Sequence, residues 1–380
     1  MRIAFVDLVR WDYTIDSVYR IPLGGSQSAL CYLAEELARL GYEVYLVNNS
    51  TTKGVSRGVT CCPLNATPAR LWQSLDVAVL QNAVQPALDL RGLLGPQTRL
   101  VVWTQHAHDQ PAVQPIADPR VQAVLDAVVL VSNWQRQAYE QYLKLVHCPR
   151  QVLQNAAGPR FFELAAEPDP STEPRPPVLA YTSTPFRGLD VLLDVFPEIR
   201  RRVPGCRLRV YSSMRVYQVP AHKDDARHGP LYDRCRATEG VEYVGSVVQS
   251  ELADELRGAS VLAYPNTFPE TSCIAVIEAL AAGCQVVTSD LGALGETAAG
   301  FATLVSPRLT GDAYRGAFTT AVCRALRAAA ENSQPYRDQT ARQRAYVSEH
   351  YSWRRRAVQW SAYLEELLAG RVQAKRWPAA

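Results

Sequence analysis

Short apolar runs alternate with helical patterns along almost the whole chain. Between the first two strand-like runs, residues 26–40 place Leu30, Leu33 and Leu37 on one helical face. The runs in the first half are RIAFVDL (2–8), YEVYLVNN (42–49), DVAVLQN (76–82), RLVVWTQH (99–106) and AVVLVSN (127–133). Parallel strands joined by crossover helices produce this pattern, so it predicts a doubly wound α/β sheet in the first part of the chain.

The alternation stops at a proline-rich, acidic segment and then restarts. ELAAEPDPSTEPRPPV (163–178) has no periodicity and is predicted to be an interdomain linker. The later strand-like runs are LAYTS (179–183), RLRVYSS (207–213), VEYVG (241–245), SVLAYP (260–265) and CQVVTSD (284–290), with helical patterns between them. A second α/β domain is predicted, and a length of 380 residues also favours two domains.

The predicted organisation has four parts. These are an N-terminal Rossmann-like domain at 1–162, the linker at 163–178, a C-terminal Rossmann-like domain at 179–350, and an amphipathic helix within 351–380 that packs back toward the first domain. Open α/β sheets bind ligands beyond the carboxyl ends of their strands. Two such domains facing across a cleft therefore direct attention to the loops that leave those strands.

Composition excludes several classes of function. A formal charge of +3 with interleaved acids and bases gives no strong field toward nucleic acid. The sequence starts directly with a strand-like run and has no apolar stretch of membrane-spanning length, so a cytoplasmic location is expected. The nine cysteines form no C-x-x-C pair and no Cys/His cluster at metal-ligand spacing, so we expect buried, reduced thiols.

The first candidate loop is IPLGGSQSAL, in which Gly24 and Gly25 precede a predicted helix. Glycines permit close backbone approach, and a helix N-terminus offers unpaired N–H groups and a positive dipole. The loop is neither a G-x-G-x-x-G fingerprint nor a Walker loop. Anion or sugar binding is one interpretation, and a flexible turn before a helix is the other.

The second candidate loop is STPFRGLDVLL, where Arg187 follows the first strand of the second domain and Ser183, a further candidate for ligand binding, lies at the end of that strand. An arginine at this place can donate in a fork to phosphate oxygens, and its charge persists at any working pH. A solvated surface arginine is the alternative.

The third candidate is FPETSCIAVIE, which carries Glu270 and Glu278 eight positions apart. If a helix begins near Ser272, the N–H groups of Thr271, Ser272, Cys273 and Ile274 form a phosphate seat. Glu278 then lies about 9 Å along the helix axis, on the other side of this seat from Glu270. The arrangement suits an elongated ligand with a central diphosphate and a diol at each end, although many helices carry such a pair by chance.

These segments together resemble a known family. FPETSCIAVIEALAAGCQVVTSDLGALGE resembles the E-x7-E region of family four retaining glycosyltransferases of the GT-B fold. The resemblance continues, in the family's order, through PLGGSQSALCYLAEELARLGYEVYLV, VVWTQHAHD, VLVSNWQRQAY, RGLDVLL and VEYVGSVVQSELADELRGASVLAYP. It implies two Rossmann-like domains and transfer of a hexosyl group from a nucleotide-diphosphate sugar with retention of configuration.

The resemblance also implies residue roles. Glu278 would bind the ribose hydroxyls and Glu270 the hydroxyls of the donor sugar, while Arg187 neutralises the departing diphosphate. His106 would touch the transferred sugar, and a core histidine at a strand end is the alternative. The backbone of residues 271–274 would seat the diphosphate, Gly24 and Gly25 would approach it from the first domain, and residues 245–248 would contact the base.

The chain departs from the family pattern in two places. The usual basic pair is reduced to TSTPFRG, so phosphate neutralisation rests on Arg187, backbone dipoles and Arg215 of SSMRVYQ. The usual Asn-Gly of the hinge appears as QNAAG, which leaves the role of Asn155 open. There is no D-x-D pair, in keeping with the metal independence that the family implies, and no other cofactor is expected.

Alternatives from other classes stay open. A nucleotide-sugar epimerase or hydrolase would share the fold, as would an inactive sugar-nucleotide-binding protein, whereas a dinucleotide oxidoreductase would need glycines where Leu8, Val9 and Arg10 stand. The donor base is open between uridine, guanosine and adenosine. The acceptor is a saccharide or another small, lipid or peptide molecule, and weak peripheral contact with the inner membrane face through residues 134–146 is compatible with the sequence. Oligomeric state has no visible sequence signal.

Overall fold

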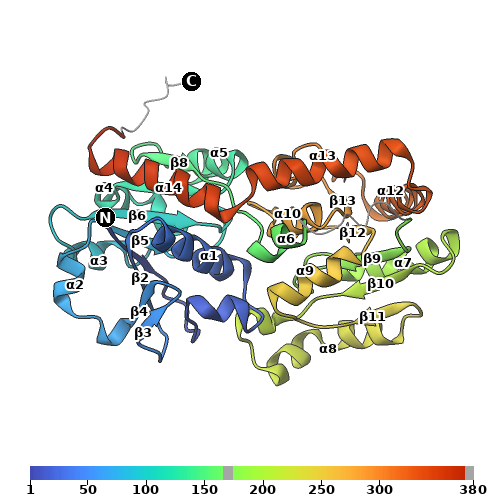
Figure 1. The fold of residues 1–380 in the computed structure, drawn as a ribbon, viewed down its shortest axis with the longest axis horizontal. Coiled ribbons are helices and arrows are strands. Elements are labelled where there is room, and N and C mark those ends of the chain that lie inside the picture. The colour runs from blue at the N-terminus through green and yellow to red at the C-terminus, as the bar shows by residue number, and fades with distance from the viewer. Residues whose placement is uncertain (166–173, 373–380) are drawn as a thin grey trace. The chain divides into compact units, whose positions relative to one another are not determined.

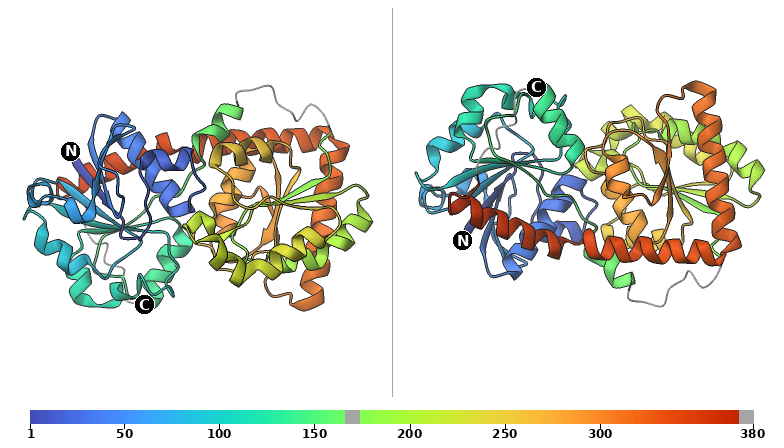
Figure 2. Two further views of the ribbon diagram at one scale, coloured as in Figure 1. Left: turned by 90° about the horizontal axis from the view of Figure 1, so that it is seen from below. Right: turned by 90° about the horizontal axis from the view of Figure 1, so that it is seen from above.

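The computed structural model describes residues 1–165 and 174–372, which divide into two compact units (Figure 1). Unit 1 comprises Met1–Val18, Gly25–Asn155 and the described part of Trp353–Ala380, and unit 2 comprises Tyr19–Gly24 and Ala156–Ser352. Each unit has a sheet with helices on both faces (Figure 2). The predicted fold class, two doubly wound parallel-sheet domains, is confirmed.

Unit 1 contains an eight-stranded sheet in the order β3-β4-β2-β1-β5-β6-β7-β8, parallel except for the antiparallel pair β3 and β4. Its central strands are apolar and buried on both faces because helices cover both sides of the sheet. The strands are β1 (Arg2–Val6), β2 (Glu43–Asn48), β3 (Gly54–Ser56), β4 (Val59–Pro63), β5 (Val77–Gln81), β6 (Arg99–Thr104), β7 (Ala127–Leu130) and β8 (Arg150–Val152).

The helices of unit 1 bury side chains on both faces of this sheet. Phe5 and Trp103 contact Trp360 of the C-terminal helix α14 on one face, and Tyr32 of α1 stacks on Trp353 of the same helix. Side chains of α2, α3, α4 and α5 pack with the opposite face. The helices are α1 (Gly25–Arg39), α2 (Ala69–Gln73), α3 (Ala87–Leu93), α4 (Pro119–Val124), α5 (Asn133–Tyr142) and α14 (Trp353–Leu368), with 3-10 turns η1 (Ile15–Tyr19), η2 (Leu64–Ala66) and η3 (Gln114–Ala117).

Unit 2 contains a six-stranded parallel sheet in the order β11-β10-β9-β12-β13-β14. The strand order reverses at β9 and β12, which lie side by side although α7, β10, α8, β11 and α9 separate them in the sequence. The strands are β9 (Val178–Tyr181), β10 (Arg207–Val210), β11 (Val241–Tyr243), β12 (Val261–Tyr264), β13 (Gln285–Ser289) and β14 (Ala302–Val305). Such a reversal is the usual ligand position in open α/β sheets.

The helices of unit 2 include two that contain Pro197 and Pro230 in their interior. They are α6 (Pro159–Ala165), α7 (Leu189–Arg202), α8 (Ala221–Ala237), α9 (Gln249–Arg257), α10 (Ile274–Ala281), α11 (Leu294–Ala298), α12 (Gly311–Glu331) and α13 (Gln334–His350), with the 3-10 turn η5 (Met214–Tyr217). In the part of the chain that the structure describes, no helix combines the length and apolarity needed to cross a membrane.

The boundary between the units differs from the prediction. The chain passes from unit 1 to unit 2 after Asn155, not after residue 162, because α6 packs into the core of unit 2 through Phe161 and Leu164. Of the predicted linker, residues 166–173 lie outside the described residues. Unit 2 also takes in Tyr19–Gly24, a segment within the first predicted domain, and it ends at Ser352.

Arg175, inside the predicted linker segment, is buried in unit 2 and joins the ends of two helices. Its guanidinium donates to the carbonyl oxygen of Ala259 at 2.8 Å, just beyond α9, and to that of Ala282 at 3.2 Å, at the end of α10. Both helices end with unpaired carbonyl groups and a partial negative charge, which a guanidinium satisfies. The linker sequence therefore supplies a structural cation to unit 2.

Arg175→Met is expected to lower the free energy of unfolding by about 2–4 kcal/mol, because the buried carbonyl group of Ala282 loses its donor and that of Ala259 keeps only the weak Cys284 thiol. Chemical denaturation of the variant measures the loss. Arg201→Met is the control, because the Arg201 side chain is 72% exposed and its ion pair with Glu198 lies at the surface. Equal stability of the two variants would contradict the role of Arg175.

Candidate functional site

The loops that follow β9 and β12 in unit 2 bring together two of the predicted site residues. Arg187 follows β9 and Glu270 follows β12, and these strands are neighbours at the reversal of strand order. The Arg187 guanidinium donates from Nη1 to Oε1 of Glu270 at 2.7 Å. Two residues predicted from separate motifs thus form one ion pair at the carboxyl edge of the sheet.

The surroundings of this ion pair are largely buried. The Glu270 side chain is 7% exposed and the Arg187 side chain 21%. The hydroxyl of Tyr264 also donates to Oε1 of Glu270, at 2.6 Å, and the guanidinium carbon of Arg187 lies 4.6 Å from the centre of the Phe268 ring. Burial lowers the pKa of Arg187, but the Glu270 carboxylate and the nearby ionisable groups together outweigh it and the net pKa is raised, so the guanidinium stays charged.

Two glycines allow the backbone to reach this geometry. Gly188, the N-cap of α7, has φ +101°, and a Cβ there would lie 2.1 Å from the carbonyl oxygen of Pro265. Gly292 has φ +67°, and a Cβ there would lie 2.4 Å from the carbonyl oxygen of Glu270. The loops that follow β9 and β13 therefore both pack closely against the backbone of the segment that carries Glu270. Only glycine fits at these two contacts.

The helix after Glu270 begins later than predicted. α10 starts at Ile274 with Cys273 as its N-cap, rather than near Ser272, and no side-chain hydrogen bond caps it. Among the described residues, the backbone N–H groups of Cys273, Ile274 and Ala275 donate no hydrogen bond. Thr271 and Ser272 therefore precede the helix, and a diphosphate seat at the N–H groups of residues 271–274 stays a prediction.

Glu278 lies inside α10 and is 4% exposed. Burial raises the pKa of its carboxyl group to about 8, although a hydrogen bond from the Gln249 side chain lowers it. Gln249 is the first residue of α9, directly after the predicted base-contacting loop at 245–248. A ligand that donates hydrogen bonds to Glu278 would favour its ionised form.

Several hydroxyl groups at the carboxyl edge of this sheet have no hydrogen-bond partner among the residues that the structure describes. They are buried, and an unsatisfied buried hydroxyl is costly unless a ligand or water supplies a partner. Ser183 differs, since its Oγ lies 3.3 Å from the Tyr264 hydroxyl. The unpartnered hydroxyls belong to Thr182, Thr184, Ser212 and Thr288. The edge therefore presents polar groups that a hydroxyl-rich ligand can satisfy.

Arg215, the second cation considered from the sequence, lies in η5 after β10 and is exposed. The turn is fixed by the buried Asp224, which accepts from Ser213 Oγ at 2.7 Å and from the backbone N–H of Met214 at 2.9 Å. Arg215 makes no hydrogen bond or ion pair with Arg187 or Glu270 within the described residues, 1–165 and 174–372. Arg187 is thus the cation that the structure places beside Glu270.

His106 lies in unit 1, two residues beyond β6, and its loop is held from several sides. Its backbone N–H donates to Thr104 Oγ1 at 3.1 Å, and its carbonyl oxygen accepts from Gln135 Nε2 at 2.8 Å and from the Tyr139 hydroxyl at 2.9 Å. Asn155 adds a further bond, from its Nδ2 to Gln105 Oε1 at 3.1 Å. Asn155, whose role the sequence left open, thus anchors the residue before His106.

Gly24 and Gly25 lie on either side of the boundary between the units. Gly24 ends the segment Tyr19–Gly24 of unit 2, and Gly25 is the exposed first residue of α1 in unit 1. The glycine pair does begin a helix, as predicted. A ligand at this helix start stays a prediction.

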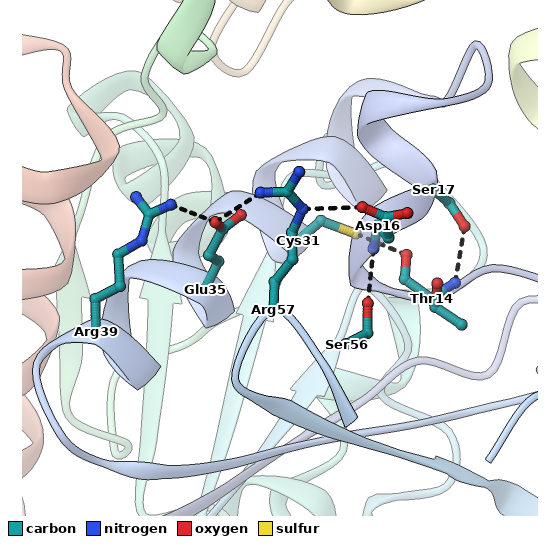
Figure 3. Close-up of polar contacts among 8 residues, drawn as sticks. All are labelled: Thr14, Asp16, Ser17, Cys31, Glu35, Arg39, Ser56 and Arg57. Carbon is teal, nitrogen blue, oxygen red and sulfur yellow. Dashed lines mark hydrogen bonds and ion pairs between the residues drawn. The ribbon is translucent and has the colours of Figure 1, made fainter. Parts of the chain in front are cut away.

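Within unit 1, residues 14–17 are held by a charged network (Figure 3). Arg57, in the turn between β3 and β4, donates to Asp16 at 3.0 Å and to the buried Glu35 of α1 at 3.2 Å. The backbone N–H of Asp16 donates to Ser56 Oγ, and the Cys31 thiol contacts the carbonyl oxygen of Thr14. This network fixes the 3-10 turn η1 against α1 and the turn between β3 and β4.

Sequence reasoning missed several residues of the site in unit 2. Tyr264 and Phe268 surround the ion pair, Gln249 contacts Glu278, and Gly292 supports the Glu270 backbone. Tyr264 offered one signal, a polar aromatic at the end of an otherwise apolar strand. Gly292 offered another, a glycine shortly after a buried strand. Within the described residues, no group of three or more His, Cys, Asp or Glu side chains could hold a metal ion.

Comparison with known sequences finds a match within unit 2. Residues 176–327 match the family model described as Glycosyl transferases group 1. A phosphatidyl-myo-inositol mannosyltransferase of Mycobacterium tuberculosis is 32% identical over 114 residues, which are 29% of this chain and 26% of that protein. A D-inositol 3-phosphate glycosyltransferase of Rhodococcus erythropolis is 32% identical over 114 residues, 29% of this chain and 25% of that protein. The match thus spans about a quarter of these relatives' length.

Comparison with solved structures covers nearly the whole chain. A glycosyltransferase from Rickettsia africae gives a TM-score of 0.71 at 13% identity, covering 97% of this chain and 99% of that one. A sucrose-phosphate synthase from Thermosynechococcus elongatus gives 0.68 at 16% identity, covering 97% and 100%. Anabaena HepE in complex with UDP-glucose gives 0.61 at 13% identity, covering 96% and 99%. These likenesses show that the chain has the GT-B fold.

Proposed function

We propose that this chain is a glycosyltransferase that moves a hexosyl group from a nucleotide-diphosphate sugar to an acceptor. One observation carries the proposal: in unit 2, the ion pair of Arg187 with Glu270 and the unpaired N–H groups at the start of α10 adjoin one another at the reversal of strand order. This region lies within the segment that matches the glycosyl transferases group 1 model. An anion and a set of sugar hydroxyls are the ligands that such groups suit.

The donor would bind through three parts of unit 2. Glu278 accepts hydrogen bonds from the two ribose hydroxyls, the N–H groups from Cys273 to Ala275 bind the diphosphate, and Glu270 accepts from hydroxyls of the sugar. The seven residues between the two glutamates separate the two diols along the ligand. Relatives' names support a nucleotide-sugar donor, since HepE is recorded with UDP and UDP-glucose.

The Arg187 guanidinium has further N–H groups that can donate hydrogen bonds to the leaving group. Its Nη1 donates to Glu270, whereas its buried Nε–H has no hydrogen-bond partner among the described residues. We infer that this remaining N–H and the dipole of α10 stabilise the negative charge that develops on the diphosphate as the bond to the anomeric carbon breaks. We propose that these groups perform the charge neutralisation without a metal ion.

Transfer with retention of configuration is part of the proposal. The departing phosphate would take the acceptor proton, so Glu270 orients the sugar and does not act as the nucleophile. For His106, in unit 1, we propose contact with the transferred sugar. The acceptor is a polyhydroxylated compound, either free or attached to a lipid, and the inositol derivatives in the names of the matched relatives belong to this class.

A ligand panel tests donor binding. The Tm of the wild-type protein and of the Glu278→Ala variant is measured with UDP, GDP, ADP and their glucose or mannose conjugates. A ligand at a hundred times its dissociation constant stabilises the native state by about 2.7 kcal/mol, so one nucleobase series is expected to raise the Tm of the wild type and not of the variant. Absence of any shift with every nucleotide, at concentrations up to millimolar, would contradict the proposal.

A further inference from the structure

Among the described residues, both hydrogen bonds to the side-chain carboxylate of Glu270 end on the same oxygen atom. Nη1 of Arg187 donates to Oε1 at 2.7 Å, and the Tyr264 hydroxyl donates to Oε1 at 2.6 Å. Among the described residues no donor to Oε2 is recorded. Since an ionised carboxylate offers about two acceptor positions on each oxygen, the protein saturates one oxygen and leaves the other for a ligand.

The Tyr264 hydroxyl can donate to Glu270 only if it is itself oriented. Tyr264 is 1% exposed, at the end of β12, and its hydroxyl also lies 3.3 Å from Oγ of Ser183 in the β9 loop. Because the Tyr264 proton goes to Glu270, the serine is the donor in the second contact. The bonds then run from Ser183 through Tyr264 to Glu270 and join the ends of two neighbouring strands.

Burial keeps this hydroxyl protonated. Burial first, and the negative charge of Glu270 second, raise the pKa of Tyr264 far above its ordinary value of 10.0. The hydroxyl is therefore a proton donor at every pH at which the protein is studied. A hydrogen bond to a charged acceptor in a water-poor site is also stronger than one between neutral groups.

We propose that Tyr264 is a positioning residue that, together with Arg187, fixes the Glu270 carboxylate so that Oε2 faces the hydroxyl groups of the donor sugar. The inference rests on the proposed function and deepens it. Under this proposal Ser183 orients the Tyr264 hydroxyl and does not itself contact the nucleotide sugar. It also separates sugar recognition from recognition of the nucleoside diphosphate, which does not involve Glu270.

Tyr264→Phe tests this inference because it removes one oxygen atom and keeps the buried ring. Dissociation constants are measured for UDP, GDP and ADP and for their glucose or mannose conjugates. With the nucleobase that binds the wild type, we expect affinity for the sugar conjugate to fall about tenfold and affinity for the free diphosphate to stay unchanged. Turnover of the sugar conjugate, followed as release of the nucleoside diphosphate, should fall with it.

Tyr181→Phe is the matched control. Tyr181 is equally buried on the adjacent strand β9, but its hydroxyl donates to the backbone carbonyl of Thr184 at 2.8 Å. Tyr264→Phe loses the bond to Glu270 and the longer contact with Ser183, whereas Tyr181→Phe loses one bond to a backbone carbonyl, so Tyr264→Phe should lose somewhat more stability. Only Tyr264→Phe should discriminate against the sugar conjugate. In a Glu270→Ala background, which removes the acceptor of the Tyr264 hydroxyl, Tyr264→Phe should cause no further loss of affinity for the conjugate.

The outcomes separate this inference from the proposed function. An unchanged affinity of Tyr264→Phe for the conjugate, an equal loss for conjugate and free diphosphate, or the same discrimination by Tyr181→Phe would overturn the role of Tyr264 while donor binding stands. Failure of the wild type to bind any nucleotide would contradict the proposed function, and the inference would fall with it.

Discussion

Glu278→Gln is expected to weaken nucleotide binding strongly and to stabilise the empty protein at pH values above about 4.5. The carboxylate offers two acceptor oxygens to a ribose diol, whereas the amide offers one oxygen and a competing NH2 group. Hydrogen bonds to a charged group are worth about 1.5–3 kcal/mol each, so loss of this pair should weaken nucleotide affinity by about a hundredfold or more. Titration of the variant with the nucleotide that binds the wild type measures this loss.

The stabilising effect follows from the pKa of Glu278. Burial raises this pKa to about 8 from an ordinary value of 4.5, so between these pH values the native protein keeps a proton that the unfolded chain has released. Stability of the wild type therefore falls as pH rises through this window, and the cost is about 3 kcal/mol at pH 7. The amide introduced by Glu278→Gln does not ionise in either state, so the substitution removes the penalty.

Denaturation of both proteins between pH 4 and pH 9 is the measurement. The variant should match the wild type near pH 4 and exceed it increasingly toward pH 8, where Glu278 ionises. Nucleotide affinity of the wild type should rise with pH up to about pH 8, because the ligand selects the ionised form. A constant difference in stability across the whole range would contradict the raised pKa of Glu278.

Gly292→Ala should damage stability and activity together. The added Cβ would meet the carbonyl oxygen of Glu270 at 2.4 Å and its nitrogen at 2.6 Å, and neither backbone atom can yield without moving the site. Alanine at φ +67° also costs about 1–2 kcal/mol in backbone energy. With the overlap, the free energy of unfolding should fall by about 3 kcal/mol, and Tm by roughly 6–12 °C.

Gly295→Ala is the control for this prediction. Gly295 lies three residues further on in α11, and a Cβ there would make only ordinary contacts, the nearest at 3.4 Å to Asp290. It should leave Tm and donor binding close to those of the wild type. Gly292→Ala should bind the sugar conjugate less well than this control even at a temperature where both variants are fully folded. If the two variants behave alike, Gly292 does not support Glu270.

The strands and the fold class were predictable because buried parallel strands have nearly continuous apolar sequences. The runs predicted for β1, β2, β5, β6, β7 and for β9 to β13 all form strands. The short strands β3, β4, β8 and β14 were missed. In β8 and β3 no residue is fully buried, so hydrophobic periodicity gave no signal there.

The boundary between the units was less predictable, because contacts decide it and composition does not. The proline-rich stretch suggested a linker beginning at residue 163, yet α6 belongs to unit 2 and Arg175 is buried there. Likewise, the segment Tyr19–Gly24 carries no pattern that would assign it to unit 2. Such assignments depend on tertiary contacts between residues far apart in the sequence.

The motifs predicted which residues form the candidate site in unit 2 but not how they pair. Arg187 and Glu270 are 83 residues apart, and only the adjacency of β9 and β12 brings them to 2.7 Å. The start of α10 was misplaced because Cys273 is not a typical N-cap residue and the sequence gave no capping signal. Tyr264 and Gln249 were missed because their partners come from other elements.

The most direct test of the central claim is acceptor-dependent consumption of a nucleotide sugar. The wild type and Glu270→Ala are incubated with the nucleotide sugar selected by the ligand panel and a set of saccharide and polyol acceptors, and the products are analysed by chromatography and proton NMR. We predict release of nucleoside diphosphate only with an acceptor, a glycoside of retained anomeric configuration, and loss of both in the variant. Consumption without an acceptor would indicate a hydrolase or epimerase, and no consumption with any acceptor, or full turnover by Glu270→Ala, would contradict the account.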